Sequence, residues 1–186
     1  ASANGYERIV KLLLSKSADV NAPPGYGSTP LYEALKNGHE NIAELLLSKG
    51  ADVNVQVGSA LQAASWGGHK RIVELLLSKA ANVNLDGYRG TALYIASVRG
   101  HEQIVEILLN NGAEVNIQPQ VCHQCSTDIR KDDDCHAYYD NALQAASARG
   151  HERVIKLLLS KGANIVVQSK RTYGGSALRA ASANGH

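Results

Sequence analysis

The chain has 186 residues, of which 44% are hydrophobic and 19% are charged, and its formal net charge is +2 at pH 7. So small a positive charge gives no support for a nucleic-acid partner, and no apolar run approaches the roughly 18 residues that a membrane-spanning helix needs. All three cysteines lie between residues 122 and 135, so the rest of the chain carries no disulfide framework.

A Gly-His pair recurs along the whole chain, with Gly5-Tyr6 as an altered first copy. The pairs occupy residues 38–39, 68–69, 100–101, 150–151 and 185–186. The glycines at 5, 38, 68, 100, 150 and 185 are therefore 33, 30, 32, 50 and 35 residues apart. A period in this range indicates a stack of supersecondary units. We therefore expect function to reside on a surface and not in a closed pocket.

Each unit begins with a short first helix. In residues 59–90, Ser59 occupies the position where a hydroxyl accepts from free backbone N–H groups at a helix start. The equivalent residues are all good N-caps, namely Thr29, Thr91, Asn141 and Ser176. Pro30 follows Thr29 at the first helical position, where its missing N–H is not needed. The pattern predicts a helix that ends at the Gly-His turn.

A second, amphipathic helix follows the turn. Residues 72–77 are mostly Ile, Val and Leu, and residues 70, 71, 74 and 79 are charged. The same apolar run returns at 9–14, 42–47, 104–109 and 154–159. Two such short helices cannot bury so wide an apolar stripe alone, so units must stack. Glycine follows the second helix at positions 50, 112 and 162, which favours a left-handed residue at the helix end. In two units the equivalent residue is Ser17 or Ala80.

This order of two helices and a connecting finger loop resembles the ankyrin repeat, whose Thr-Pro-Leu-His signature matches Thr29-Pro30-Leu31. The resemblance implies an all-α solenoid with repeats over 1–117 and 141–186, truncated at both ends, and an inserted loop at 118–140. The signature histidine is replaced in every copy, by Tyr32, Gln62, Tyr94, Gln144 and Arg179. The Thr–His hydrogen bond of the family is therefore absent, and capping is expected to rely on the hydroxyl or amide alone.

A narrower motif, Ala-Leu-Gln-Ala-Ala-Ser-x-x-Gly-His, occurs at 60–69 and 142–151. It resembles long fungal ankyrin arrays, some of which follow a NACHT-type nucleotide-binding domain. Because both ends of the chain fall within a unit, we expect a fragment of a larger multidomain protein. The composition and the resemblance predict a monomeric, intracellular array in the cytoplasm.

The insertion gathers every cysteine of the chain. The candidate zinc ligands are Cys122, Cys125, Cys135 and His136. Cys-x-x-Cys is a common first half of a structural zinc site, but Cys135 and His136 are adjacent, whereas paired ligands are usually separated. Two other interpretations remain open: a solvated finger loop that binds no metal, or a gene-model artefact such as an unspliced intron.

No catalytic motif is present. The sequence has neither a Gly-x-x-x-x-Gly-Lys-Ser/Thr phosphate loop nor a Gly-x-Ser-x-Gly nucleophile elbow. The histidines of the Gly-His pairs are periodic, so we expect them to close the turns between helices. Apart from the candidate zinc, we expect no cofactor and no enzymatic activity.

A protein-binding surface is the favoured function. Ankyrin-like arrays bind partners with their first helices and fingers, and the two residues before each Gly-His turn vary from unit to unit here. Tryptophan and arginine are enriched among interface hot spots. The predicted partner-binding residues are Trp66, Tyr32, Tyr94, Val98, Arg99, Arg149, Lys36 and Tyr88. The alternatives are a passive spacer between domains and a zinc-dependent interaction loop at 118–140.

If the insertion binds zinc, metal analysis of purified protein should find about one ion per chain. Replacing Cys122 or Cys135 by serine should then remove it, because each would remove a thiolate ligand. Protein that is free of metal, with all three thiols titrating freely, would contradict the zinc site.

Overall fold

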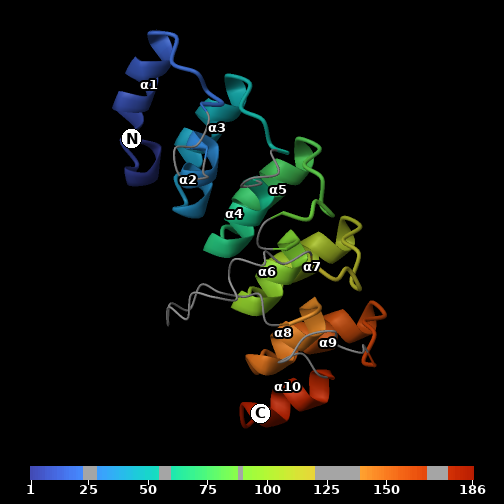
Figure 1. The fold of residues 1–186 in the computed structure, drawn as a ribbon. Coiled ribbons are helices and arrows are strands. Elements are labelled where there is room, and N and C mark those ends of the chain that lie inside the picture. The colour runs from blue at the N-terminus through green and yellow to red at the C-terminus, as the bar shows by residue number, and fades with distance from the viewer. Residues whose placement is uncertain (23–28, 55–59, 88–89, 120–138, 167–175) are drawn as a thin grey trace.

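The computed structural model describes residues 1–22, 29–54, 60–87, 90–119, 139–166 and 176–186. Within these ranges the regular structure is helical, apart from one isolated bridge between Gly87 and Gly90. The helices stack in chain order from the N-terminus to the C-terminus (Figure 1). This arrangement confirms the predicted all-α repeat fold.

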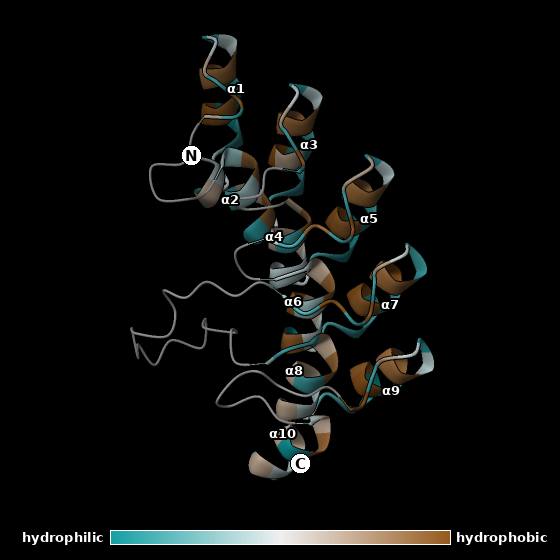
Figure 2. Cartoon of the chain, turned by 45° about the vertical axis from the view of Figure 1, so that its right-hand side comes forward, coloured by the Kyte–Doolittle hydropathy of each residue, from teal (hydrophilic) through white to brown (hydrophobic). Residues whose placement is uncertain are grey.

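Two kinds of helix alternate after a short 3-10 helix, η1 (Ser2–Asn4). The first helices of the units are α2 (Pro30–Lys36), α4 (Ala60–Gly67), α6 (Ala92–Arg99), α8 (Ala142–Ala148) and α10 (Ala177–Ala183). The second helices are α1 (Glu7–Ser15), α3 (Glu40–Ser48), α5 (Lys70–Ser78), α7 (Glu102–Asn110) and α9 (Glu152–Ser160). Figure 2 shows the first helices in one column and the second helices in another beside it.

Side-chain caps start four of the first helices as predicted. Thr29, Thr91, Asn141 and Ser176 each accept a hydrogen bond from the backbone N–H three residues later. Pro30 occupies the first turn of α2. Ser59 lies outside the described residues.

Two of the residues that replace the signature histidine form hydrogen bonds that we did not expect. The amide of Gln62 donates to the carbonyls of Leu85 and Gly90, at 3.0 and 2.7 Å, and so holds the next finger. The side chain of Gln144 accepts from the backbone N–H of Asp140 at 2.8 Å, in the manner of a capping box. The expectation that capping relies only on the N-cap residue is therefore wrong for the unit that begins at Asn141.

One continuous apolar core runs through the stack. It extends from Val10 in α1 to Ala177 in α10 and takes residues from every helix between them. Stacking is what buries it: Leu46 is 1% exposed, whereas Leu13, which occupies the same position in the terminal helix α1, is 49% exposed. The amphipathic stripe is thus closed by the neighbouring unit and not by the unit's own two helices.

Asparagines join the loops that follow the second helices. Asn21, Asn54, Asn84 and Asn116 each accept a hydrogen bond from a backbone N–H of the next unit, at 2.8 or 2.9 Å. Three of them also donate to the carbonyl of the glycine that ends the next second helix. These bonds satisfy backbone groups that the helix ends leave free.

The second helices end in left-handed residues, as the sequence predicts. Gly50, Gly112 and Gly162 have φ of 84–86°, and the non-glycine residues Ser17 and Ala80 have φ of 61° and 58°. In both the Gly50 and the Ala80 unit, the next N–H bonds back to the carbonyl five residues earlier, Leu46 or Leu76. The helix end is therefore the same whether the residue is glycine or alanine, and Ala80 carries a steric cost of about 1 kcal/mol.

We predict that Ala80→Gly raises the melting temperature, against the usual direction of an alanine-to-glycine change, by relieving up to about 1 kcal/mol of backbone strain. Gly50→Ala is the matched control. No atom lies within 4 Å of a Cβ added at Gly50, so this change tests backbone strain alone and should lower the melting temperature. Thermal unfolding of both variants measures the effect, and an unchanged or lower midpoint for Ala80→Gly would contradict it.

Candidate protein-binding surface

The eight predicted partner-binding residues fall into distinct classes of exposure. Trp66, Tyr94 and Val98 are buried, at 8%, 2% and 4% exposed. Tyr32 and Lys36 are half-buried, and Arg99 and Arg149 are exposed. Tyr88 lies outside the described residues. The expectation of an exposed aromatic anchor at Trp66 is therefore wrong, and the arginines are the residues that reach the surface.

Trp66 belongs to a second apolar cluster, separate from the main core. The cluster joins Trp66 of α4 to Tyr94, Ile95 and Val98 of α6 and to Ala145 of α8. The side chains of α4, α6 and α8 are therefore buried by two sets of apolar contacts. Trp66 therefore fills this interior cluster and is not free surface, although the equivalent residue differs between units.

A row of mostly exposed residues follows the turns instead. We call the residue directly before each turn glycine the turn-edge row: Asn4, Asn37, Gly67, Arg99, Arg149 and Asn184. All are exposed except Gly67, which is half-buried. The sequence predicted that both residues before each turn glycine vary at the surface. In the structure it is mainly the second residue of each pair that is exposed. The first residue is buried in the units of Trp66, Val98 and Ala148.

The turn histidines fix the backbone under this row. The Nε2 atoms of His39, His69, His101 and His151 lie 3.0–3.3 Å from carbonyl oxygens of the preceding unit. Those carbonyls belong to Ala3, Lys36, Trp66 and Val98, each immediately before a member of the turn-edge row. The expectation that each histidine closes its own turn is wrong in this respect, because its side chain links neighbouring units.

Glycine is required where the histidine ring rests. A Cβ added at Gly38 would lie 2.5 Å from Cε1 of His69, and the φ of Gly38 is +73°. Any other residue would therefore meet both backbone strain and a clash with the ring. The Gly-His pair thus repeats together with a packing contact, in which the histidine ring of one unit lies against the turn glycine of the preceding unit.

Partial burial changes the acidity of one of these histidines, His101. Burial lowers the pKa of His101, and the positive charge of Arg99 adds to the effect, although the hydrogen bond to the Trp66 carbonyl opposes it. The folded protein therefore favours the neutral imidazole. Such a histidine holds adjacent units together and is poorly placed to exchange protons with a substrate.

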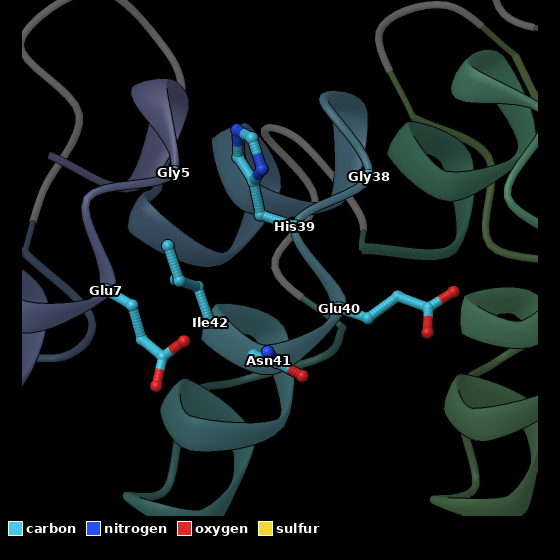
Figure 3. A pocket seen from close by; sticks show the side chains of 7 residues that line it. All are labelled: Gly5, Glu7, Gly38, His39, Glu40, Asn41 and Ile42. Atoms are coloured by element: carbon cyan, nitrogen blue, oxygen red, sulfur yellow. The ribbon is translucent and has the colours of Figure 1, made fainter.

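A small pocket lies beside the first turns, between α1 and α3. It has a volume of about 350 Å³ and is lined by Gly5, Glu7, Gly38, His39, Glu40, Asn41 and Ile42. Figure 3 shows the carboxylates of Glu7 and Glu40 pointing away from the His39 ring. Nε2 of His39 is engaged with the Ala3 carbonyl, and Glu40 pairs with Arg71 at 3.3 Å. The pocket thus holds no carboxylate–imidazole pair for acid–base chemistry.

The predicted zinc ligands, Cys122, Cys125, Cys135 and His136, lie outside the described residues. Among the residues that the structure does describe, no group of three or more His, Cys, Asp or Glu side chains is placed to hold a metal ion. The zinc site therefore remains a prediction from the sequence.

Comparison with protein families decides what this stack is. A family model for ankyrin repeats in three copies matches residues 1–57 and 58–119, and a single ankyrin-repeat model matches 138–170. The chain belongs to the ankyrin-repeat family. No curated protein matches it. Ankyrin repeats are generally protein–protein interaction modules, so the turn-edge row lies on a fold whose usual activity is binding.

In the described part of this ankyrin stack, no helix has the length and apolar character needed to cross a membrane. The likeness to fungal arrays with NACHT-type domains remains a prediction, since the matches concern the repeats alone.

We predict that acid destabilises the stack through His101. Because its pKa is lowered on folding, the unfolded chain takes up the proton first, so stability is present above the ordinary histidine pKa of 6.5 and falls as pH drops through it. In His101→Gln, whose amide can still donate to the Trp66 carbonyl, the melting temperature should fall less between about pH 7.5 and about pH 5.5 than in the parent protein. His186→Gln, at the exposed C-terminal end, is the control. An equal pH dependence in His101→Gln and the parent would contradict this role.

Proposed function

We propose that this chain is a non-enzymatic interaction module that binds a protein partner along the turn-edge row and the adjoining first helices. The observation that carries the proposal is the contrast between a buried, repetitive framework and a mostly exposed row in which asparagine, glycine and arginine occupy the six positions. Histidine hydrogen bonds hold the carbonyls just before Asn4, Asn37, Gly67 and Arg99, so a partner meets this part of the row on a backbone that is already ordered. Such pre-organisation lowers the entropy cost of binding.

The proposal shifts the binding surface that the sequence alone suggested. Tyr32 and Lys36, which are half-buried on α2, can contribute beside Asn37. Trp66, Tyr94 and Val98 support the surface from beneath. We further propose that the module works in the cytoplasm, which the cysteine-free repeats favour, and that it forms part of a larger protein, as the resemblance to long ankyrin arrays implies.

The spacer hypothesis makes a different prediction. A spacer needs no cluster of exposed arginine side chains on one edge, whereas Arg99 and Arg149 occupy equivalent exposed positions in successive units. That pair favours binding over a passive role. A zinc-dependent loop at 118–140 would be a second binding element and does not compete with the row.

Selection of peptides from a displayed random library, followed by NMR mapping, tests the proposal. Selected peptides should shift the backbone amide signals of the turn-edge row and leave those of α3, α5 and α7 in place. Asn37→Ala with Arg149→Ala should weaken binding at least about fivefold, because both side chains are exposed on the row.

Glu44→Ala with Glu106→Ala is the matched control, since both residues are exposed on second helices. This control should leave the affinity unchanged. Failure to select any peptide, or signals that move mainly on the second helices, would support the spacer instead.

A further inference from the structure

We propose that the turn-edge row recognises an acidic segment of its partner, with two carboxylate side chains bound by Arg99 and Arg149. This inference rests on the proposed function and names the chemistry of the partner. It depends on how Arg99 is held, on the absence of ion-pair partners for Arg99 and Arg149 among the described residues, and on the positions of the two arginines in adjacent units.

Arg99 is held in place by the unit before it. Its guanidinium carbon lies 4.6 Å from the centroid of the Trp66 ring. Trp66 is itself fixed, since it is buried in the second apolar cluster and its carbonyl is bonded to His101. A cation–π contact uses the charge of the guanidinium and leaves its N–H donors available to a planar carboxylate. Trp66 is therefore a positioning residue for Arg99.

Two arginines on the other side of the stack form ion pairs between units. On the second helices, Arg71 lies 3.3 Å from Glu40 and Arg153 lies 3.2 Å from Glu102, each pair joining neighbouring units. Within the described part of the chain, neither Arg99 nor Arg149 has an ion-pair partner. The array thus uses some arginines to tie units together and leaves these two available on the row.

The positive charge of Arg99 also affects a neighbouring histidine. The charge of Arg99 contributes to lowering the pKa of His101, after burial as the largest cause. Arg99 thus places a positive charge at the edge of the stack beside α6, and a partner carboxylate would be attracted to it. A partner with like charge would be repelled.

The spacing of the two arginines predicts the spacing of the carboxylates. Arg99 and Arg149 occupy the same position in adjacent units, and their helices α6 and α8 pack against each other. Packed helices lie about 8–10 Å apart. A segment in the polyproline II conformation has three residues per turn and rises about 3.1 Å per residue, so its side chains three positions apart share one face about 9 Å apart. Acidic residues three positions apart in such a segment fit this distance.

The test uses synthetic peptides of known charge. The probe is a short Gly/Ser peptide with two aspartates three residues apart, and the comparison peptides carry asparagine at both positions or two adjacent aspartates. NMR of the arginine Nε–Hε groups should show the probe shifting the signals of Arg99 and Arg149 and not those of Arg71 and Arg153. Binding should weaken with added salt, since these charges are exposed.

Variants test whether binding depends on these two arginines or only on the positive charge of the protein as a whole. Arg99→Gln and Arg149→Gln should each weaken probe binding by about threefold to fivefold, and the double variant should weaken it further. Arg8→Gln on the exposed face of α1 is the matched control and should bind like the parent. Trp66→Leu should reproduce the Arg99→Gln loss while the shift at Arg149 persists, whereas Trp66→Phe, which keeps a ring, should lose less. Circular dichroism of each variant checks that it is folded.

Several results would overturn the inference. If the asparagine peptide binds as tightly as the aspartate probe, charge plays no role in recognition. If the probe shifts the signals of all arginines equally, Arg99 and Arg149 do not form a specific site. Tighter binding of single-stranded oligothymidine than of the acidic peptide would assign the row to nucleic acid. If neutral peptides selected from the library bind the row, the interaction module stands and only its acidic specificity is wrong.

Discussion

The hydrogen bond from the turn histidines His39, His69, His101 and His151 to the backbone of the preceding unit determines how neighbouring units meet. It needs three features at once: an imidazole at the start of the second helix, a carbonyl near the end of the preceding first helix, and a glycine without a Cβ beneath the ring. The clash that a Cβ at Gly38 would make with His69 explains why the pair repeats as Gly-His. The asparagine bonds between successive loops add a second line of contact on the other end of the helices. Between these two lines, the apolar stripes of adjacent helices close over a continuous core.

This constraint also shapes the binding surface. The histidine bonds fix the carbonyls just before Asn4, Asn37, Gly67 and Arg99, so these residues extend from backbone positions that are held in the same way in each unit. A substitution in the row then changes the side chain that a partner meets, but not the backbone position from which that side chain extends. Asn37, Arg99 and Arg149 present an amide and two guanidinium groups on equivalent backbone positions. A solenoid can in this way acquire specificity by single substitutions, since its scaffold does not depend on the exposed residue.

Trp66 illustrates where reasoning from repeat variation fails. A residue that differs between copies of a strict repeat need not be exposed, because an interior cavity can also differ between units. Here the tryptophan, together with Tyr94 and Val98, fills a cluster above α4, α6 and α8 that α2 and α10 do not share. At α10 the residue equivalent to Trp66 is Ala183, which is exposed. The functional role of the tryptophan in our proposal is therefore indirect: its ring holds Arg99.

The sequence by itself determined the helices, their caps and the stacked architecture. These follow from local rules: hydroxyl and amide caps before apolar runs, a periodic stripe too wide for one unit to bury, and glycine at left-handed helix ends, all of which repeat and so reinforce one another. Even Ala80, which breaks the glycine pattern, occupies the left-handed conformation that the register predicts. Only the tertiary structure decided which variable residues are surface and which are core. The target of each histidine and the stacking of Arg99 on Trp66 join residues about 30 to 50 positions apart. Such contacts depend on the distance and rotation between units, which side-chain packing sets and no local pattern encodes.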